Sequence, residues 1–315
     1  MRYLITFLPL LALMGCNTMN YKASIKDAYE RLENDDYRIL KSGIYGNIQY
    51  KIESGNGIPV LVIHGISGGY DQGIQTAANL LPENHKILSV SRFGYLRSDV
   101  PDNHNPVNQC KALIEVMDHH NIDMVFILAT SAGGTIAFRF ALLYPERVTG
   151  LIMVASGYPS PEVGKGPKGP PSFIYNDAIF QFMLNNMQRT MLKLFGISRD
   201  EYTNAEISDQ EKLHSLFNTI LPVRPRKRGI LIDQRYTNID MNVNFSDYPL
   251  ENIEKPFLIL HAKNDPMAKY ENLSVATERI NNLESVIYET GGHVLFGHEK
   301  NNRKAIAQFI HKWSQ

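Results

Sequence analysis

The stretch Met124-Val-Phe-Ile-Leu-Ala-Thr-Ser131-Ala-Gly-Gly134 decides the fold of this 315-residue chain. Its first half is a continuous apolar run, which is typical of a short strand buried on both faces of a sheet. Its second half opens an amphipathic helix, in which Ile136, Phe140 and Leu143 recur on one face. Ser131 therefore stands at a sharp turn from strand to helix, where its hydroxyl projects and the helix N-terminus supplies a positive dipole.

Outward from this turn, strands and helices alternate along the chain. Further strands are expected over Tyr37–Ile44, Ile48–Ile52, Pro59–Ile63, Lys86–Ser91, Val148–Ala155, Pro256–Leu260 and Ser285–Tyr288. Helical patterns cover Tyr270–Asn282 and Lys300–Trp313. This alternation predicts an α/β fold with a mostly parallel, doubly wound sheet that is covered on both faces. The first two strands flank Gly46-Asn47, a hairpin signal, so the predicted sheet is mixed.

Residues 157–250 depart from the alternation. They open with the Pro/Gly-rich stretch 159–171, which predicts a loop or hinge, and continue as helical sequence rich in Met and Phe. Such a segment between two strands predicts a helical cap inserted into a core of residues 37–156 and 251–315. The Met and Phe side chains either pack with one another or line part of a substrate pocket, because Met adapts to irregular apolar ligands.

Three more segments place reactive or flexible residues directly after predicted strands. His64-Gly65-Ile66, Asp265 and Gly291-Gly292-His293 each follow a different apolar run. In an open α/β sheet, ligands bind beyond the carboxyl ends of the strands, so we expect these segments to meet Ser131 there. Asp265 has a second interpretation, as the N-cap of the helix that begins near Tyr270.

Together these segments resemble the motifs of the α/β-hydrolases. The turn at Ser131 is similar to the G-x-S-x-G nucleophile elbow, with Ala129 in place of the first glycine. The stretch His261-Ala-Lys-Asn-Asp265 resembles the acid loop of that family, with Ala in place of Gly. The resemblance implies a catalytic triad in which Ser131 is the nucleophile, His293 the base and Asp265 the acid that orients the base.

The same resemblance implies an oxyanion hole made by the backbone N–H groups of Ile66 and Ala132, with Ser67 as the alternative to Ile66. His64 precedes the serine, whereas the family order is Ser, Asp, His, so we expect His64 to be a structural residue bonded to its loop backbone. Ser91–Ser98 is similar to the loop after the fourth strand in members that carry a cap. No metal ion and no organic cofactor is implied.

An ester or thioester hydrolase acting on a small to medium acyl substrate is the leading functional interpretation. Relatives with a cap and a Gly-Gly-His-Val-Leu pattern include carbon–carbon hydrolases of ring-cleavage products and enol-lactonases, which are the first alternative. A non-catalytic binding protein of the cell envelope on the same fold is the second. Serine at position 131 disfavours dehalogenases and epoxide hydrolases, which use a nucleophilic aspartate.

Charge and cysteine content exclude further classes. Thirty-two basic residues balance thirty-two acidic ones, which gives no reason to expect a nucleic-acid partner. The one basic cluster, Arg224-Pro-Arg-Lys-Arg228, predicts a solvated loop or helix start, with anionic lipid headgroups or a substrate carboxylate as the alternative contacts. Two cysteines form neither a disulfide framework nor a zinc motif, and Cys110 is expected to be buried on a helix. No feature of the sequence identifies a protein partner.

The N-terminus predicts export. A basic Arg2 precedes the apolar stretch Leu4–Met14, which has the length of a signal-peptide core and is too short to span a bilayer. The following Gly15-Cys16 completes a pattern that resembles a bacterial lipobox. The resemblance implies a signal peptide over residues 1–15, lipidation of Cys16 and a tether over residues 16–36, with anchoring to the cell-envelope membrane. In a Gram-negative host, Asn17 favours the periplasmic face of the outer membrane. An ordinary signal peptide that merely contains a cysteine is the alternative.

Overall fold

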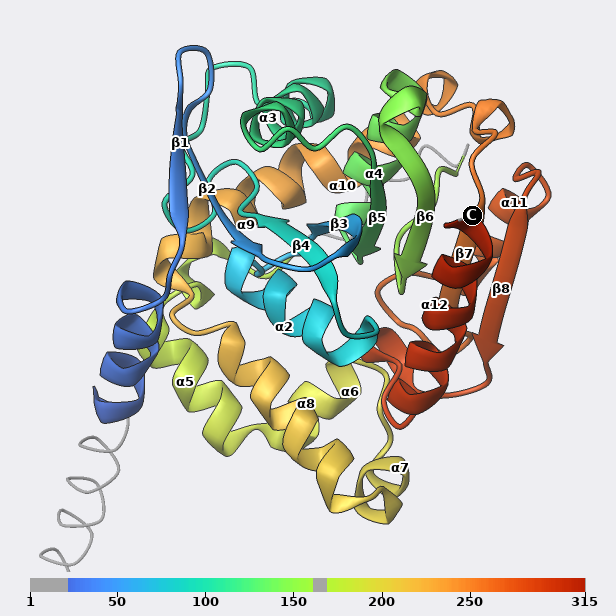
Figure 1. The fold of residues 1–315 in the computed structure, drawn as a ribbon. Coiled ribbons are helices and arrows are strands. Elements are labelled where there is room, and N and C mark those ends of the chain that lie inside the picture. Colours follow the sequence, from blue (N-terminus) through green and yellow to red (C-terminus); the bar gives the residue numbers. More distant parts are fainter. Residues whose placement is uncertain (1–21, 161–168, 315) are drawn as a thin grey trace, which may run out of the picture.

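Residues 22–160 and 169–314 are described by a computed structural model, whose ribbon is shown in Figure 1. Eight strands form one sheet in the order β1-β2-β4-β3-β5-β6-β7-β8. The strands are β1 (Arg38–Ser42), β2 (Gly46–Glu53), β3 (Gly57–Ile63), β4 (His85–Val90), β5 (Val125–Thr130), β6 (Val148–Val154), β7 (Phe257–Ala262) and β8 (Leu283–Tyr288). Only β2 pairs antiparallel with its neighbours, β1 and β4, so the predicted mostly parallel, mixed sheet is confirmed.

The central strands are buried on both faces of the sheet. Successive side chains of a strand point to opposite faces, and each face is covered by its own apolar cluster. In β3, Leu61 and Ile63 contribute to one apolar cluster, whereas Val60 and Val62 contribute to the other. The first cluster is completed by α3, α4 and α11, and the second by α2 and α12 (Figure 1). These helices are α2 (Tyr70–Leu80), α3 (Pro106–His119), α4 (Gly133–Leu143), α11 (Tyr270–Thr277) and α12 (Glu299–Trp313).

Two boundaries differ from the prediction. The hairpin turn lies at residues 43–45 rather than at Gly46-Asn47, since Ser42 pairs with Gly46 in the ladder. The Ser42 hydroxyl accepts the N–H groups of Ile44 and Tyr45, and Gly46 follows with a φ of +73°, the left-handed residue of a three-residue loop. The helix expected to run to Asn282 ends at residue 277, because the chain must turn into β8.

Between β6 and β7, the described residues 169–252 form helices and no strand. The helices are α5 (Asp177–Asn186), α6 (Gln188–Leu194), α7 (Arg199–Asn204), α8 (Ile207–Thr219), α9 (Lys227–Ile232) and α10 (Asn238–Val243), with a π-helical turn over Asp233–Thr237. Their Met, Leu and Phe side chains pack mainly with one another, in one cluster around Met191 and Phe217 and a second around Phe180 and Ile230. The boundaries of the cap as a unit, 157 and 250, remain a prediction.

A buried ion pair corrects the interpretation of the basic cluster. The cluster begins helix α9, as one interpretation expected, but it is not a solvated segment throughout, because Arg226 is fully buried. Its guanidinium binds both carboxylate oxygens of Asp71 on α2, at 3.0 and 2.7 Å, and the backbone oxygen of Gly68 at 2.7 Å. Arg226 therefore joins the inserted helices to α2, one of the helices that cover the sheet.

Candidate active site

Ser131 occupies a strained turn at the end of β5. Its φ is +49°, in the left-handed region that side-chain-bearing residues rarely adopt, and its N–H donates to Val154 O on β6 at 3.1 Å. Only small neighbours fit this turn. A Cβ at Gly133 would stand 2.3 Å from Ile63 O, and one at Gly134 would stand 2.9 Å from the side chain of Ser156. The turn thus exposes the serine hydroxyl above the sheet edge.

The loop after β3 packs directly on the same turn. A Cβ at Gly65 would lie 3.0 Å from the Ser131 Cβ, so this position brings the loop backbone close to the serine. The loop also carries His64, whose Nδ1–H donates to Gly65 O at 2.7 Å while its Nε2 accepts the N–H of Arg92 at 3.0 Å. Burial, helped by the charge of Arg92, holds the pKa of His64 well below its usual value. His64 is a neutral structural residue, as predicted.

His293 lies beside the serine. Its Nε2 is 2.8 Å from Ser131 Oγ, and its Nδ1 is 2.8 Å from Asp265 Oδ2. The ring sits on a tight turn after β8 that needs left-handed backbone at Gly291 and Gly292, with φ values of +112° and +58°. The backbone N–H of His293 donates to the backbone oxygen of Phe195, in the inserted segment, at 2.8 Å. The structure therefore brings the three predicted triad side chains into one hydrogen-bonded chain.

Asp265 is buried at the end of β7 and is a carboxylate in this setting. Its second oxygen accepts the N–H groups of Met267 and Ala268, at 2.8 and 2.9 Å. Burial by itself raises the pKa of Asp265, but the hydrogen bond and charge of His293 and these N–H groups outweigh it and lower the pKa. The N-cap interpretation does not hold, because helix α11 has Lys269 at its N-cap position.

These contacts assign the proton positions on His293. A carboxylate only accepts hydrogen bonds, so Nδ1 carries the proton and Nε2 is left with a lone pair directed at the serine hydroxyl. Ser131 can then donate its proton to Nε2. This is the tautomer that a general base requires.

The proposed oxyanion donors come from the residue that follows Ser131 and from the loop that packs on its turn. Within the described residues, the N–H groups of Ile66 and Ala132 donate no hydrogen bond to the protein. The assignment of Ile66 and Ala132, with Ser67 as the alternative to Ile66, remains a prediction.

Sequence reasoning did not find the ion pair behind this loop. Arg92 binds both carboxylate oxygens of Asp233 at 2.6 Å, and it also donates to His64 O and Gly65 O at 3.1 and 3.2 Å. The Tyr95 hydroxyl donates to the same carboxylate. Arg92 and Asp233 are almost fully buried. Arg92 lies within the Ser91–Ser98 stretch that resembles a family loop, but nothing in the sequence singled it out, and no motif marks Asp233.

A cavity of about 350 Å³ lies among the inserted helices and is lined by Leu184, Asn185, Gln188, Met191, His214, Phe217 and Asn218. None of the triad residues lines it. An aromatic path connects the two, since the ring of Phe217 lies 4.9 Å from that of Phe195, which lies 6.3 Å from the ring of His293. The Met and Phe side chains of the segment therefore pack mainly with one another, and their role in a substrate pocket remains a prediction.

The remaining features to describe are clusters of metal-binding side chains, membrane-spanning helices and the two cysteines. Among residues 22–160 and 169–314, no group of three or more His, Cys, Asp or Glu side chains is arranged to hold a metal ion. No helix in that part of the chain is both long and apolar enough to span a bilayer. Cys16 lies outside the described residues, whereas Cys110 is fully buried on α3.

Comparison with known proteins agrees with this architecture. A family profile described as the alpha/beta hydrolase fold matches residues 58–299. The uncharacterized hydrolase YcgS of Bacillus subtilis is 26% identical over 262 residues, which cover 80% of this chain and 89% of that protein. The 2-hydroxymuconate semialdehyde hydrolase of a Pseudomonas species is 27% identical over 206 residues, or 61% and 67% of the two chains.

Among solved structures, an alpha/beta hydrolase fold protein from Nakamurella multipartita superposes with a TM-score of 0.72 at 22% identity, covering 88% of this chain and 98% of that one. At this identity, the likeness concerns the fold. The family profile spans most of the chain, including β3 to β8 and the turns that carry Ser131, Asp265 and His293. The chain therefore belongs to the alpha/beta hydrolase fold family.

Proposed function

We propose that this protein is a serine hydrolase that cleaves an ester or thioester of a small to medium, apolar acyl substrate. The observation that carries the proposal is the chain of two 2.8 Å hydrogen bonds from Ser131 Oγ through the His293 ring to Asp265. A serine alone is a weak nucleophile, and this arrangement is the one that activates it.

The chemistry follows from the positions of the protons. His293 Nε2 removes the Ser131 proton while Oγ attacks the acyl carbon, and Asp265 stabilises the resulting imidazolium. The N–H groups of Ile66 and Ala132 stabilise the oxyanion, for which one such donor typically contributes about 3 kcal/mol. The imidazolium then protonates the leaving alcohol or thiol. Water, deprotonated by His293, releases the acid from the acyl-enzyme and restores the serine.

A carbon–carbon bond hydrolase is the second candidate. It is favoured by the 27% identity to the 2-hydroxymuconate semialdehyde hydrolase. The predicted export of the chain favours the ester hydrolase, since the resembling carbon–carbon hydrolases are enzymes of cytoplasmic catabolism.

A substrate panel separates these candidates. We expect turnover of p-nitrophenyl esters, with a preference along a series of rising acyl length, and none of a ring-cleavage dienoate. Turnover of the dienoate alone would establish the second candidate. A fluorophosphonate probe tests catalysis itself, because it labels an activated serine. Absence of labelling at Ser131 would leave a non-catalytic binding protein.

We further propose that the mature chain begins at Cys16 and is anchored in the envelope membrane by acyl chains on that residue. The support is the sequence pattern around Gly15-Cys16. Each buried methylene contributes about 0.8 kcal/mol, so two or three chains anchor a protein stably. We expect the wild type to enter the detergent phase on partitioning, and Cys16→Ser to lose its acyl chains. A wild-type protein in the aqueous phase with an unmodified thiol would contradict the anchor.

A further inference from the structure

Helix α5 presents an apolar surface that the described structure leaves uncovered. Its inner side chain Phe180 is buried, whereas Ile179 and Phe182, three residues apart on the outer side, are 38% and 52% exposed. Phe173, just before the helix, is 66% exposed, and Met187, just after it, is 37% exposed. We call Phe173, Ile179, Phe182 and Met187 the α5 face. Clustered large apolar side chains at a surface indicate a contact with another apolar body.

The N-terminal helix, residues 22–33, lies next to α5 (Figure 1). Ala28 shares an apolar cluster with Phe180, and the Tyr29 hydroxyl donates to Asp177 Oδ2 at 2.9 Å. Asp177 is the first residue of α5. The N-terminal helix is therefore packed against the start of α5.

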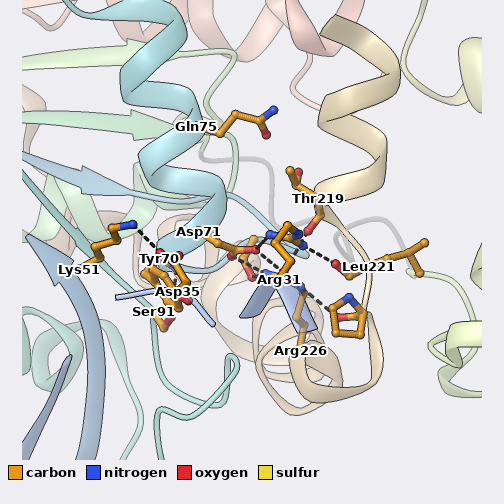
Figure 2. Close-up of polar contacts among 12 residues, drawn as sticks. Arg31, Asp35, Lys51, Tyr70, Asp71, Gln75, Ser91, Thr219, Leu221 and Arg226 are labelled. Atoms are coloured by element: carbon orange, nitrogen blue, oxygen red, sulfur yellow. Dashed lines mark hydrogen bonds and ion pairs between the residues drawn. The ribbon is translucent and has the colours of Figure 1, made fainter. Parts of the chain in front are cut away.

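An ion-pair network holds this N-terminal helix to both layers of the protein. Figure 2 shows Arg31 donating to Asp71 Oδ2 at 2.8 Å and to Leu221 O at 2.7 Å, while Arg226 binds the same carboxylate. Asp71 lies on α2, one of the helices that cover the sheet, and Leu221 lies in the inserted segment. The N-terminal helix is thus tied to α2 and to the inserted segment by the side chain of Arg31.

The geometry keeps α5 within reach of an anchored N-terminus. Residue 22 lies six positions after Cys16, and six extended residues span at most about 20 Å. From residue 22 to Tyr29, a helix advances about 10 Å. The start of α5 therefore lies within roughly 30 Å of the lipidated residue along the chain.

The exposed charges that follow helix α5 in the sequence are positive. In residues 169–197, the charged side chains are Asp177, which is buried, and Arg189 and Lys193 of α6, which are exposed. Arg224 is exposed beside Asp177, to which its backbone N–H donates. The N-terminal helix adds no net charge, since its three basic side chains balance its three acidic ones. Basic side chains flanking an apolar helix face suit anionic phospholipid.

We propose that the α5 face inserts into the headgroup–acyl boundary of the anionic membrane that holds the chain. This inference rests on the proposed lipid anchor at Cys16, and it holds whatever bond the enzyme cleaves. It places the inserted helices, with the cavity lined by Leu184 and Met191, at the lipid surface. Substrates that partition into lipid would then reach these helices from the membrane.

Tryptophan fluorescence in vesicles tests the contact on the full lipidated chain. The chain has one tryptophan, Trp313, which gives the baseline signal. Phe182→Trp adds a reporter on the α5 face. Ile44→Trp is the matched control, because Ile44 is 72% exposed in the β1–β2 turn, at the other end of the molecule from the N-terminal helix (Figure 1). Each variant is reconstituted into vesicles of phosphatidylcholine and phosphatidylglycerol, with and without bromine on the acyl chains.

We expect brominated lipid to quench the added signal of Phe182→Trp by about twofold or more, and that of Ile44→Trp hardly at all. Equal quenching of both reporters, or of neither, would overturn the proposal. A signal of Phe182→Trp that is already blue-shifted in detergent, with dimers in sedimentation, would also overturn it, because a second copy would then cover the face. Turnover of a soluble ester on the same samples reports separately on the hydrolase.

Discussion

The strand ends and the inserted helices contribute to the site in different ways. The strand ends supply all three side chains of the proposed triad, and two of them, Ser131 and His293, stand on turns with left-handed backbone at Ser131 and at Gly291. The inserted helices supply none of them, yet Phe195 O holds the backbone of His293 and Asp233 holds Arg92 behind the oxyanion loop. The proposed chemistry is thus local to the strand ends, and we expect its alignment to depend on the insertion.

The largest effect is expected at the strand ends. Ser131→Ala removes the nucleophile and one hydrogen bond, while the turn keeps its small side chain. We expect turnover of p-nitrophenyl esters to fall at least a thousandfold, since a lone oxyanion hole gives only weak residual catalysis. The unfolding midpoint in urea should stay near that of the wild type. Substantial residual turnover would mean that another residue is the nucleophile and that the strand ends do not supply the whole triad.

Asp265→Asn is the next largest. An amide can donate to Nδ1, which would favour the wrong tautomer of His293, and we expect kcat to fall by up to about ten-thousandfold. The amide can still accept the N–H groups of Met267 and Ala268, so the fold should persist. Circular dichroism and ester kinetics on the same sample check both parts. An unchanged kcat would place the orienting acid at another strand end.

These two residues could be predicted from the sequence because their positions follow local rules. A continuous apolar run indicates a strand buried on both faces, and Ser131 and Asp265 follow the buried strands β5 and β7. His293 follows β8, which is only partly buried, and its role came from the resemblance to the family motifs. The hairpin turn was misplaced by a few residues, because Gly46-Asn47 is a strong signal and the contribution of the Ser42 hydroxyl is not visible in a pattern.

The contacts of the insertion could not be predicted in the same way. Asp233 lies 141 residues from Arg92, and Arg226 lies 155 residues from Asp71. Each arginine stands in a polar or basic stretch that, read alone, indicates solvent. Only the packing of the inserted helices on the sheet buries both partners, and no short motif encodes that packing.

Asp233→Asn tests the role of the insertion. The change removes the charge that pairs with the buried Arg92, and breaking a buried pair typically costs about 3–5 kcal/mol. We expect a clear loss of stability in urea and a fall in kcat of roughly tenfold, because Arg92 also holds His64 O and Gly65 O.

A matched control is Asp247→Asn in the same inserted region, which breaks a partly exposed pair with Arg139 of α4. Exposed pairs contribute about 1 kcal/mol or less, so stability and kcat should barely change. If both variants behave alike, the ion pair behind the oxyanion loop has no special role. If Asp233→Asn loses stability but keeps kcat, the insertion supports the fold and leaves the alignment of the site to the strands.

The smallest effect concerns Asp71, where the sheet layer, the insertion and the N-terminal helix meet. Burial by itself raises the pKa of Asp71, but the charges and hydrogen bonds of Arg226 and Arg31 outweigh it and lower the pKa from 3.8 to about 2. A carboxyl with a lowered pKa stabilises the folded state above its ordinary pKa, and this contribution is lost as the pH falls from about 4 towards 2. The expected size is about 2 kcal/mol.

Over that interval, the free energy of unfolding should therefore fall more steeply in the wild type than in Asp71→Asn. Asp265 titrates in both proteins and cancels from the comparison. Parallel curves in urea between pH 5 and pH 2 would mean that the two arginines do not hold Asp71 ionised, and that the insertion is attached to the sheet by apolar packing alone.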